Sequence, residues 1–551
     1  MFWLYAHFNY YRIQILNQIY GNIKVSIYIY TILKYIFKKS PFCNNAILKC
    51  LTLLLAPIVF TTIWLLKLVK TLIACWVAFT DPHYIGMLDG TETIFIGQES
   101  KESRAIITTL FILEDKENQH LSGDDFHDFC VENITRIFEN EMFRKLQASV
   151  QYKLGYFYFK KENWPIHTCF KDFDYQSVHY TDNNMNNVYI KHQEKKLTME
   201  QLRLYVSEVS NQEMPQNGAC MWEARVSRQK LEGTNAYPII LRFHHIFGDA
   251  ITLFNMFTTD FQKQNKSTLK QNYEVEVRSL DATYTQNPFI TMNGLVDPRD
   301  SNVLCQTSGD KHIVWYTEET PQILSTIKEI KQKQKIIYNN NINVVDVLLT
   351  CFMESLTSYF NKMNINLPDK VYTVLPMMPP HGNYSAYGRV TNYEMNNKIS
   401  IGFLRLPLKL SDNFNDNTLI QRLNLIKHEY NVFKNISLDY WCNRWQGTVV
   451  LTLLPWFAQK WFIKRYGTSL MVSNIPGCDS LEFFGRLKVN EFVFIDPNTS
   501  ISGVSLMITS YEKRLNFAYT IDKAVIPDVE DVKNIAIDFM HKLNTLEEIL
   551  K

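Results

Sequence analysis

The residues of this chain best suited to chemistry are two adjacent histidines, His244 and His245, followed by Asp249 in the stretch LRFHHIFGDA. A neutral imidazole accepts a proton near pH 7, and a carboxylate at short range can orient it. The pattern indicates a general base. The alternative is that these residues form a buried turn with only a structural role, in which their polar groups are hydrogen-bonded within the core. Zinc usually needs three or four ligands, and adjacent side chains on a strand diverge, so we expect no metal.

The flanking segments predict how these residues are positioned. Residues 237–243 (YPIILRF) have the composition of a buried strand, and residues 251–257 (ITLFNMF) are apolar at helical spacing. The histidines therefore lie on a strand-to-helix turn. Side chains alternate across a strand, so one histidine faces a reaction cavity and the other is scaffold.

The turn itself contains two further candidates. Gly248 is expected to supply unusual backbone angles, which would let Asp249 fold back towards the histidine backbone or a nearby arginine. Asp249 is then a brace rather than a proton carrier.

A wider resemblance sharpens this interpretation. The segment resembles the HHxxxDG motif of CoA-dependent acyltransferases, and further stretches, in order, resemble the wax ester synthase/diacylglycerol acyltransferase family. These are MPQNGACMWE (214–223), NVVDVLL (343–349), NKISIGFLRLP (397–407), SNIPG (473–477) and the tail from Gly503. The resemblance covers residues 85 to 551.

The resemblance implies an α/β (α+β) fold of two acyltransferase-like lobes with a tunnel between them. We expect a membrane anchor region over 1–80, an N-terminal lobe with the motif over 81–265, a crossover linker over 266–310 and a C-terminal lobe over 311–551. Strands are expected at 91–98, 104–113, 371–377 and 399–406, and helices at 124–139, 197–210, 321–334 and 344–360.

The implied activity is O-acyl transfer from acyl-CoA to a lipid hydroxyl, either of a long-chain alcohol or of diacylglycerol. His245 would be the general base, His244 and Asp249 would orient it, and Asn474 and Gly248 would contact substrate. No bound cofactor is implied, and acyl-CoA is the co-substrate. Trp222 is expected to pack in the core.

The sequence departs from the family pattern at two places. Ala250 replaces the last glycine of the motif, and Val345 displaces the asparagine of the family's "ND" pair, with Asn343 two residues earlier. These departures leave open a catalytically silent lipid-binding relative. A structural membrane protein, in which the histidine turn is only packing, is a further alternative.

Composition excludes other classes. A net charge of +2, without a zinc finger, basic helix or glycine-rich phosphate loop, gives no reason to expect a nucleic-acid partner. The ten cysteines form no C-x-x-C pair, so we expect reduced, packed thiols and no disulfide framework.

Residues 50–66 (CLTLLLAPIVFTTIWLL) and 71–80 form the strongest membrane signal. They either span once or turn back as a hairpin at 66–70. The lysines before the stretch and the acidic residues after it would place the body of a single-span protein across the membrane from the cytosol. Acyl-CoA is chiefly cytosolic, so we prefer a hairpin or an in-plane helix, with a cytosolic body.

We expect the endoplasmic reticulum membrane, with the plasma membrane as the alternative. A second apolar stretch, residues 448–467, is broken by Pro455 and ends in basic residues. It is typical of a membrane-surface element, a tunnel lining or a buried core helix.

Overall fold

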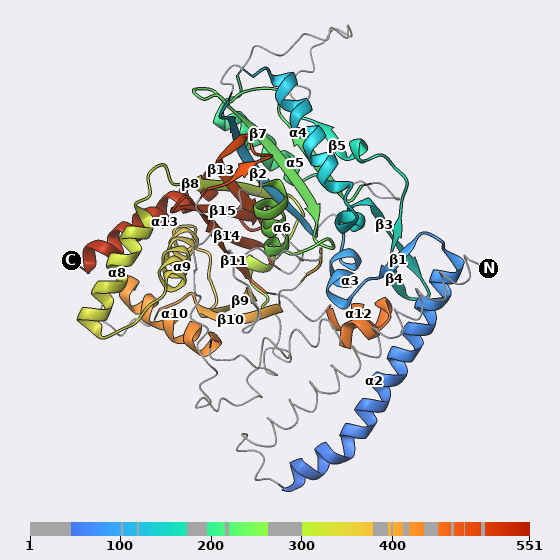
Figure 1. The fold of residues 1–551 in the computed structure, drawn as a ribbon. Helices are drawn as coiled ribbons and strands as arrows, with labels where there is room; N and C mark the ends of the chain where they lie inside the picture. Colours follow the sequence, from blue (N-terminus) through green and yellow to red (C-terminus); the bar gives the residue numbers. More distant parts are fainter. Residues whose placement is uncertain are drawn as a thin grey trace. The chain divides into compact units, whose positions relative to one another are not determined.

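The computed structural model carries the histidine pair at the end of a strand in a six-stranded sheet (Figure 1). The described residues are 46–100, 103–117, 121–173, 196–214, 220–262, 300–377, 395–397, 400–410, 418–434, 450–463, 468–478, 480–497 and 502–550. The predictions for residues 1–45 and for most of the 266–310 linker lie outside them.

The motif sheet has the strand order β12-β13-β2-β7-β6-β5. Its two central strands, β2 and β7, pair antiparallel so that Ile106 lies opposite His244. Both strands are almost continuously buried, as their apolar sequences predict. The bounds are Ile106–Asp115 (β2), Phe170–Asp172 (β5), Trp222–Val226 (β6), Ala236–His244 (β7), Glu482–Phe483 (β12) and Leu487–Ile495 (β13).

The helices of this part follow the sequence closely. Helix α5 begins with the capping box expected from its sequence, in which Thr198 and Gln201 exchange side-chain and backbone hydrogen bonds. The bounds are Gly123–Phe138 (α4), Met199–Ser210 (α5) and Ala250–Met256 (α6).

A second six-stranded sheet has the order β10-β9-β11-β14-β15-β8 and its own apolar core. The two strands and the two helices predicted in this part from the sequence are confirmed within a few residues. The strands are Lys311–Thr317 (β8), Lys370–Met377 (β9), Ser400–Pro407 (β10), Leu470–Cys478 (β11), Val504–Tyr511 (β14) and Arg514–Asp522 (β15). The helices are Ile323–Tyr338 (α8), Val344–Lys362 (α9), Thr418–Lys434 (α10) and Val529–Ile549 (α13).

The chain returns from the second half to the first. Strand β13 lies between β12 and β2 in the motif sheet, although its sequence falls within 311–551. Its Glu491 accepts hydrogen bonds from Trp315 and Thr317 of β8, and its Phe492 carbonyl accepts one from Asn516 of β15. The two sheets are therefore tied through β13, and the 311–551 segment is not a self-contained lobe.

Residues 91–98 were predicted as a strand and are instead a helix, α3 (Gly90–Gly97). Asp89 caps its start and forms a capping box with Glu92, so both terminal backbone donors are satisfied. The alternating apolar pattern of TETIFIG was outweighed by this cap. A small three-stranded sheet has the strand order β1-β4-β3. Its strands are Tyr84–Met87 (β1), Ala148–Lys153 (β3) and Tyr156–Lys161 (β4).

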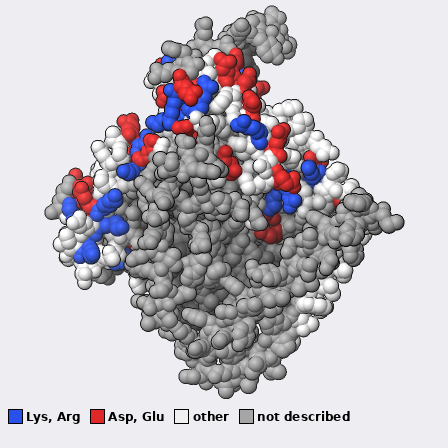
Figure 2. Space-filling model, viewed as in Figure 1, with Lys and Arg blue, Asp and Glu red and all other residues white. Residues whose placement is uncertain are grey.

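Helix α2 runs without interruption from Ala46 to Thr80. The hairpin at residues 66–70 is therefore wrong, because the lysines there do not break the helix. Among the described residues this one helix is long and apolar enough to cross a membrane, over Thr61–Thr80. Acidic and basic side chains mingle on the described surface shown in Figure 2, in keeping with the small net charge.

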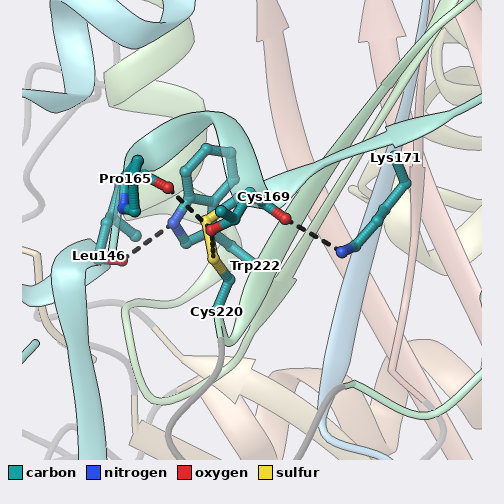
Figure 3. The surroundings of a disulfide bond; sticks show 7 residues. Leu146, Pro165, Cys169, Lys171, Cys220 and Trp222 are labelled. Carbon is teal, nitrogen blue, oxygen red and sulfur yellow. Dashed lines mark hydrogen bonds between the residues drawn. A yellow bond between two sulfur atoms is a disulfide. The ribbon is translucent and has the colours of Figure 1, made fainter. Parts of the chain in front are cut away.

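The structure contains a disulfide between Cys169 and Cys220, whose Cα atoms lie 5.6 Å apart (Figure 3). The prediction of reduced thiols was wrong for this pair. The two cysteines are 51 residues apart, and the parallel pairing of β5 with β6 brings them together. Trp222 is buried beside them and its indole N–H donates to the Leu146 carbonyl, as a core residue would.

Candidate active site

The two histidines have different roles in hydrogen bonding. The backbone N–H of Ile246 donates to Nδ1 of His244 at 3.2 Å, so the ring proton is assigned to Nε2, which lies 3.0 Å from Glu99 Oε2. Both nitrogens of this buried ring are thus used. His244 is held as scaffold.

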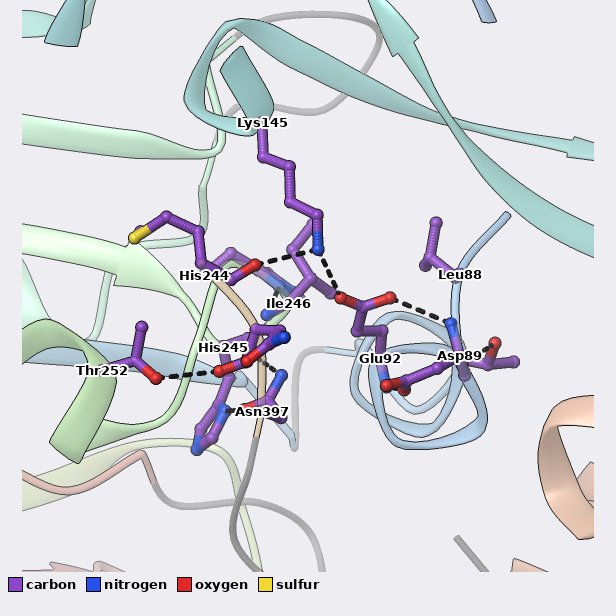
Figure 4. Close-up of polar contacts among 12 residues, drawn as sticks. Leu88, Asp89, Glu92, Lys145, His244, His245, Ile246, Thr252 and Asn397 are labelled. Carbon is purple, nitrogen blue, oxygen red and sulfur yellow. Dashed lines mark hydrogen bonds and ion pairs between the residues drawn. The ribbon is translucent and has the colours of Figure 1, made fainter. Parts of the chain in front are cut away.

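His245 is held through one nitrogen only. Its Nδ1 lies 2.8 Å from Asn397 Oδ1, and the Nδ2 of the same amide donates to the His245 carbonyl at 2.8 Å (Figure 4). Because the amide nitrogen is committed to the carbonyl, the amide oxygen must face Nδ1, and Nδ1 must carry the proton. Within the described part of the chain, Nε2 makes no hydrogen bond, so its lone pair is available as a base.

Burial keeps this base neutral. Loss of solvent lowers the pKa of the His245 imidazole to about 4, and the Asp249 carboxylate opposes part of that effect. The ring of Phe95 stacks on the imidazole, with ring centroids 3.9 Å apart. Phe95 comes from α3, so the helix that was predicted as a strand supplies one wall of the site.

Asp249 is the N-cap of α6 and accepts the backbone N–H of Thr252 at 2.8 Å. It therefore fixes the start of α6 directly after the histidine turn, and its role as a brace for the histidines stays a prediction. Ala250 is the first residue of the helix and has no positive φ, so the departure from glycine is accommodated.

Gly248 does not serve the purpose expected of it. It is absent from the positive-φ residues, which the described structure places at other glycines. A Cβ at this position would lie 2.7 Å from Thr252 Cγ2 and 3.5 Å from the Asn396 carbonyl. Gly248 is favoured by its close packing against Thr252 of α6 rather than by backbone angles.

Residues 395–397 cross from the second half of the sequence to the histidine turn. Lys145 Nζ donates to the Met395 carbonyl at 2.9 Å, and Thr252 Oγ1 donates to the Asn396 carbonyl at 2.9 Å. Lys145 also pairs with Glu92 at 3.0 Å. Burial, with the nearby Asp89 charge, raises the pKa of Glu92 to about 7, and the Lys145 ammonium works against the shift. Figure 4 shows these contacts converging on the segment that carries Asn397.

Two other family-like residues, Asn343 and Asn474, differ in their surroundings. Asn343 and Asp346 form a capping box at the start of α9, so the altered "ND" stretch begins a helix. Asn474 is exposed on β11 and lies outside the hydrogen bonds made by the two histidines. Asn397, Phe95 and Glu99 are site residues that sequence reasoning missed. Only Asn397 gave a signal, as the first residue of the NKISIG stretch.

Comparison with known proteins bears on the family and the fold of the chain. Residues 395–547, which begin at the segment that holds His245, match the model of the WS/DGAT C-terminal domain. This match lies in the C-terminal part of the chain, where it bears out the family resemblance found in the sequence. No curated protein sequence matches the chain significantly.

Solved structures with a similar fold share little sequence with this chain. The wax ester synthase/diacylglycerol acyltransferase from Marinobacter aquaeolei VT8 has a TM-score of 0.53 at 14% identity, covering 84% of this chain and 99% of that one. The trichothecene 15-O-acetyltransferase TRI3 from Fusarium sporotrichioides has a TM-score of 0.53 at 9% identity, covering 83% and 94%. The first condensation domain of the calcium-dependent antibiotic synthetase has a TM-score of 0.52 at 8% identity, covering 85% and 97%. The mixed α/β architecture resembles this two-lobed condensation and acyltransferase fold.

Proposed function

We propose that this protein is an O-acyltransferase that moves a fatty acyl group from acyl-CoA to a lipid hydroxyl, with His245 as general base. The WS/DGAT domain and the acyltransferase fold support an acyltransferase. The observation that carries the role of His245 is its hydrogen bonding: Asn397 holds the proton on Nδ1 and leaves Nε2 available.

In the proposed reaction, the acceptor oxygen attacks the thioester carbonyl carbon while Nε2 of His245 takes the hydroxyl proton. The tetrahedral intermediate then collapses, the carbon–sulfur bond breaks, and the CoA thiolate takes the proton from the imidazolium. Both substrates are bound together and no acyl-enzyme forms. A general base contributes about 10²–10⁴-fold, so alignment of the substrates and stabilisation of the oxyanion supply the rest.

The acceptor is a long-chain alcohol, which would give a wax ester, or diacylglycerol, which would give triacylglycerol. We favour the alcohol slightly. The exposed amide of Asn474 on β11 is proposed to contact substrate. We propose that the enzyme is bound to the endoplasmic reticulum membrane and contacts membrane lipid. Helix α2 supports membrane binding because it is long and apolar enough to act as an anchor.

The test is a competition between acceptors. Detergent-permeabilised microsomes containing the full chain would receive radiolabelled palmitoyl-CoA together with hexadecanol and dioleoylglycerol, beside permeabilised microsomes containing His245→Ala. We expect histidine-dependent label in wax ester, in triacylglycerol or in both, and the product names the acceptor. Label in neither product would exclude both acceptors and favour the catalytically silent lipid-binding relative.

A further inference from the structure

Three elements of the described chain contact one another: the last turns of α2, the β3–β4 hairpin and the segment that leads into α12 (Trp456–Ile463). Lys70 of α2 donates to the carbonyls of Leu88 and Thr452, at 3.0 and 2.9 Å. The Gly155 carbonyl at the hairpin tip accepts the Trp456 N–H at 2.7 Å. The end of α2 is therefore packed into the body.

The same three elements expose large apolar side chains. We call this set the apolar rim: Trp76 and Phe79 of α2, Tyr152 and Leu154 of the hairpin, and Phe457 and Trp461 of α12. Phe79, Leu154 and Phe457 are 85%, 59% and 71% exposed. Tight contacts join the members, because Lys153 Nζ lies 4.2 Å from the Trp76 ring centroid and Pro455 and Phe457 pack against the Gly155 position.

Leu154 is in a conformation that disfavours leucine. The hairpin turn consists of Leu154 and Gly155, with φ of +50° and +87°. Two-residue hairpin turns of this kind favour Asn, Asp or Gly at the first position, because a branched side chain is strained at positive φ. The hairpin therefore carries an exposed apolar side chain at a turn position that favours polar residues or glycine.

We propose that the apolar rim docks on the lipid bilayer, as a second membrane contact beside the helix. The candidate span, Thr61–Thr80, runs directly into the rim through Trp76 and Phe79. Aromatic rings with a lysine among them are the composition of the membrane–water interface. The body then rests on the bilayer surface, and an acceptor dissolved in lipid reaches it without crossing water. The docking itself does not depend on the proposed reaction.

Photocrosslinking of the full chain in nanodiscs tests this contact. p-Benzoylphenylalanine would replace Leu154 or Phe457, and the nanodiscs would contain phosphatidylcholine with radiolabelled acyl chains. Matched control positions are Ile336 of α8 and Ile537 of α13, which are exposed apolar residues outside the rim, at 73% and 67%. We expect several-fold more labelled lipid on the chain from positions 154 and 457 than from 336 and 537.

Equal labelling at all four positions would overturn the proposal, and so would a crosslink to a second copy or to another protein in place of lipid. Leu154→Asn separates contact from folding, because asparagine suits the positive φ of the turn. This variant should unfold at a temperature no lower than the unmodified chain, yet capture less lipid through the probe at 457. Unchanged capture would show that Leu154 makes no contact with the bilayer.

Discussion

At the scale of single residues, Asn397 determines which nitrogen of His245 is basic. Replacing it with leucine removes the acceptor for Nδ1–H and the donor to the His245 carbonyl. We expect Asn397→Leu to lower kcat by about 10²-fold, the lower end of what general-base help supplies, with little change in KM. Steady-state kinetics with palmitoyl-CoA and the preferred acceptor measure this. A fall in thermal stability with unchanged kcat would assign Asn397 a purely structural role.

Asn397→Asp is the matched conservative variant. A carboxylate beside Nδ1 keeps the acceptor and favours the imidazolium, which raises the pKa of His245. Activity near pH 7 should be better retained than in Asn397→Leu, and the acid limb of kcat/KM should move to higher pH. An acid limb at the position of the unmodified enzyme would contradict the pairing of this residue with the base.

The depressed pKa of His245 makes a prediction of its own. Because the folded value is about 4, against 6.5 for an ordinary histidine, the base stays neutral well below pH 6. The acid limb of kcat/KM due to His245 should therefore have its midpoint near pH 4. As the pH falls below 6.5, this histidine binds a proton in the unfolded chain before it does so in the folded protein. Its contribution to the free energy of unfolding is therefore highest above pH 6.5 and decreases as the pH falls towards 4. A midpoint near 6.5 would contradict the burial of the ring.

At the scale of elements, the glycine of SNIPG is required by strand packing. A Cβ on Gly477 would lie 1.1 Å from the Ser510 carbonyl oxygen of β14. Gly477→Ala should destabilise the protein by about 3 kcal/mol or more, since a backbone atom cannot move aside cheaply. Gly86→Ala is the matched control, with nothing within 4 Å of its Cβ position. The midpoint temperatures of thermal unfolding of the two variants would be measured in detergent. Equal midpoint temperatures would contradict this prediction.

The sequence predicted most elements because their signals are local. The buried runs of β2 and β7 and the capping box of α5 are each readable within a dozen residues. The mistaken strand at 91–98 also had a readable signal, the spacing of Asp89 and Glu92 at its start, which outweighs two or three alternating apolar residues. The type of an element is therefore predicted well only when the capping residues at its start are considered together with the spacing of its apolar residues.

Contacts between distant segments were not predictable in this way. The entry of β13 into the motif sheet, the pairing of Cys169 with Cys220 and the contact of Asn397 with His245 all join residues far apart in sequence. The family resemblance located His245 but not its hydrogen-bond partner Asn397. Nothing in the spacing of the ten cysteines distinguishes the bonded pair from the rest.

At the scale of the whole molecule, the disulfide and the helix bear on which side of the membrane the body lies. Disulfides persist in oxidising compartments and are rare in the cytosol. A continuous α2 also removes the hairpin that would return the chain to its starting side. With lysines at 34, 38, 39 and 49 before the candidate span, the positive-inside rule would place the body on the lumenal side if α2 crosses the membrane.

We therefore predict that the body is protected from protease added outside sealed microsomes and becomes cleavable after detergent. In the same preparation Cys169 and Cys220 should resist alkylation until reduced, and loss of their bond through Cys169→Ser should cost about 2–5 kcal/mol. Cleavage of the body in sealed microsomes, with both thiols free, would instead favour the cytosolic orientation expected from the supply of acyl-CoA.

The most direct test of the account is the dependence of acyl transfer on His245. The rate of palmitoyl transfer from palmitoyl-CoA would be measured for the unmodified chain, for His245→Gln and for His83→Gln, which makes the same change at an exposed histidine. We predict that His245→Gln slows transfer by about 10²–10⁴-fold, while His83→Gln leaves it unchanged. Transfer by His245→Gln at the rate of the unmodified chain would contradict the assignment of His245 as the base.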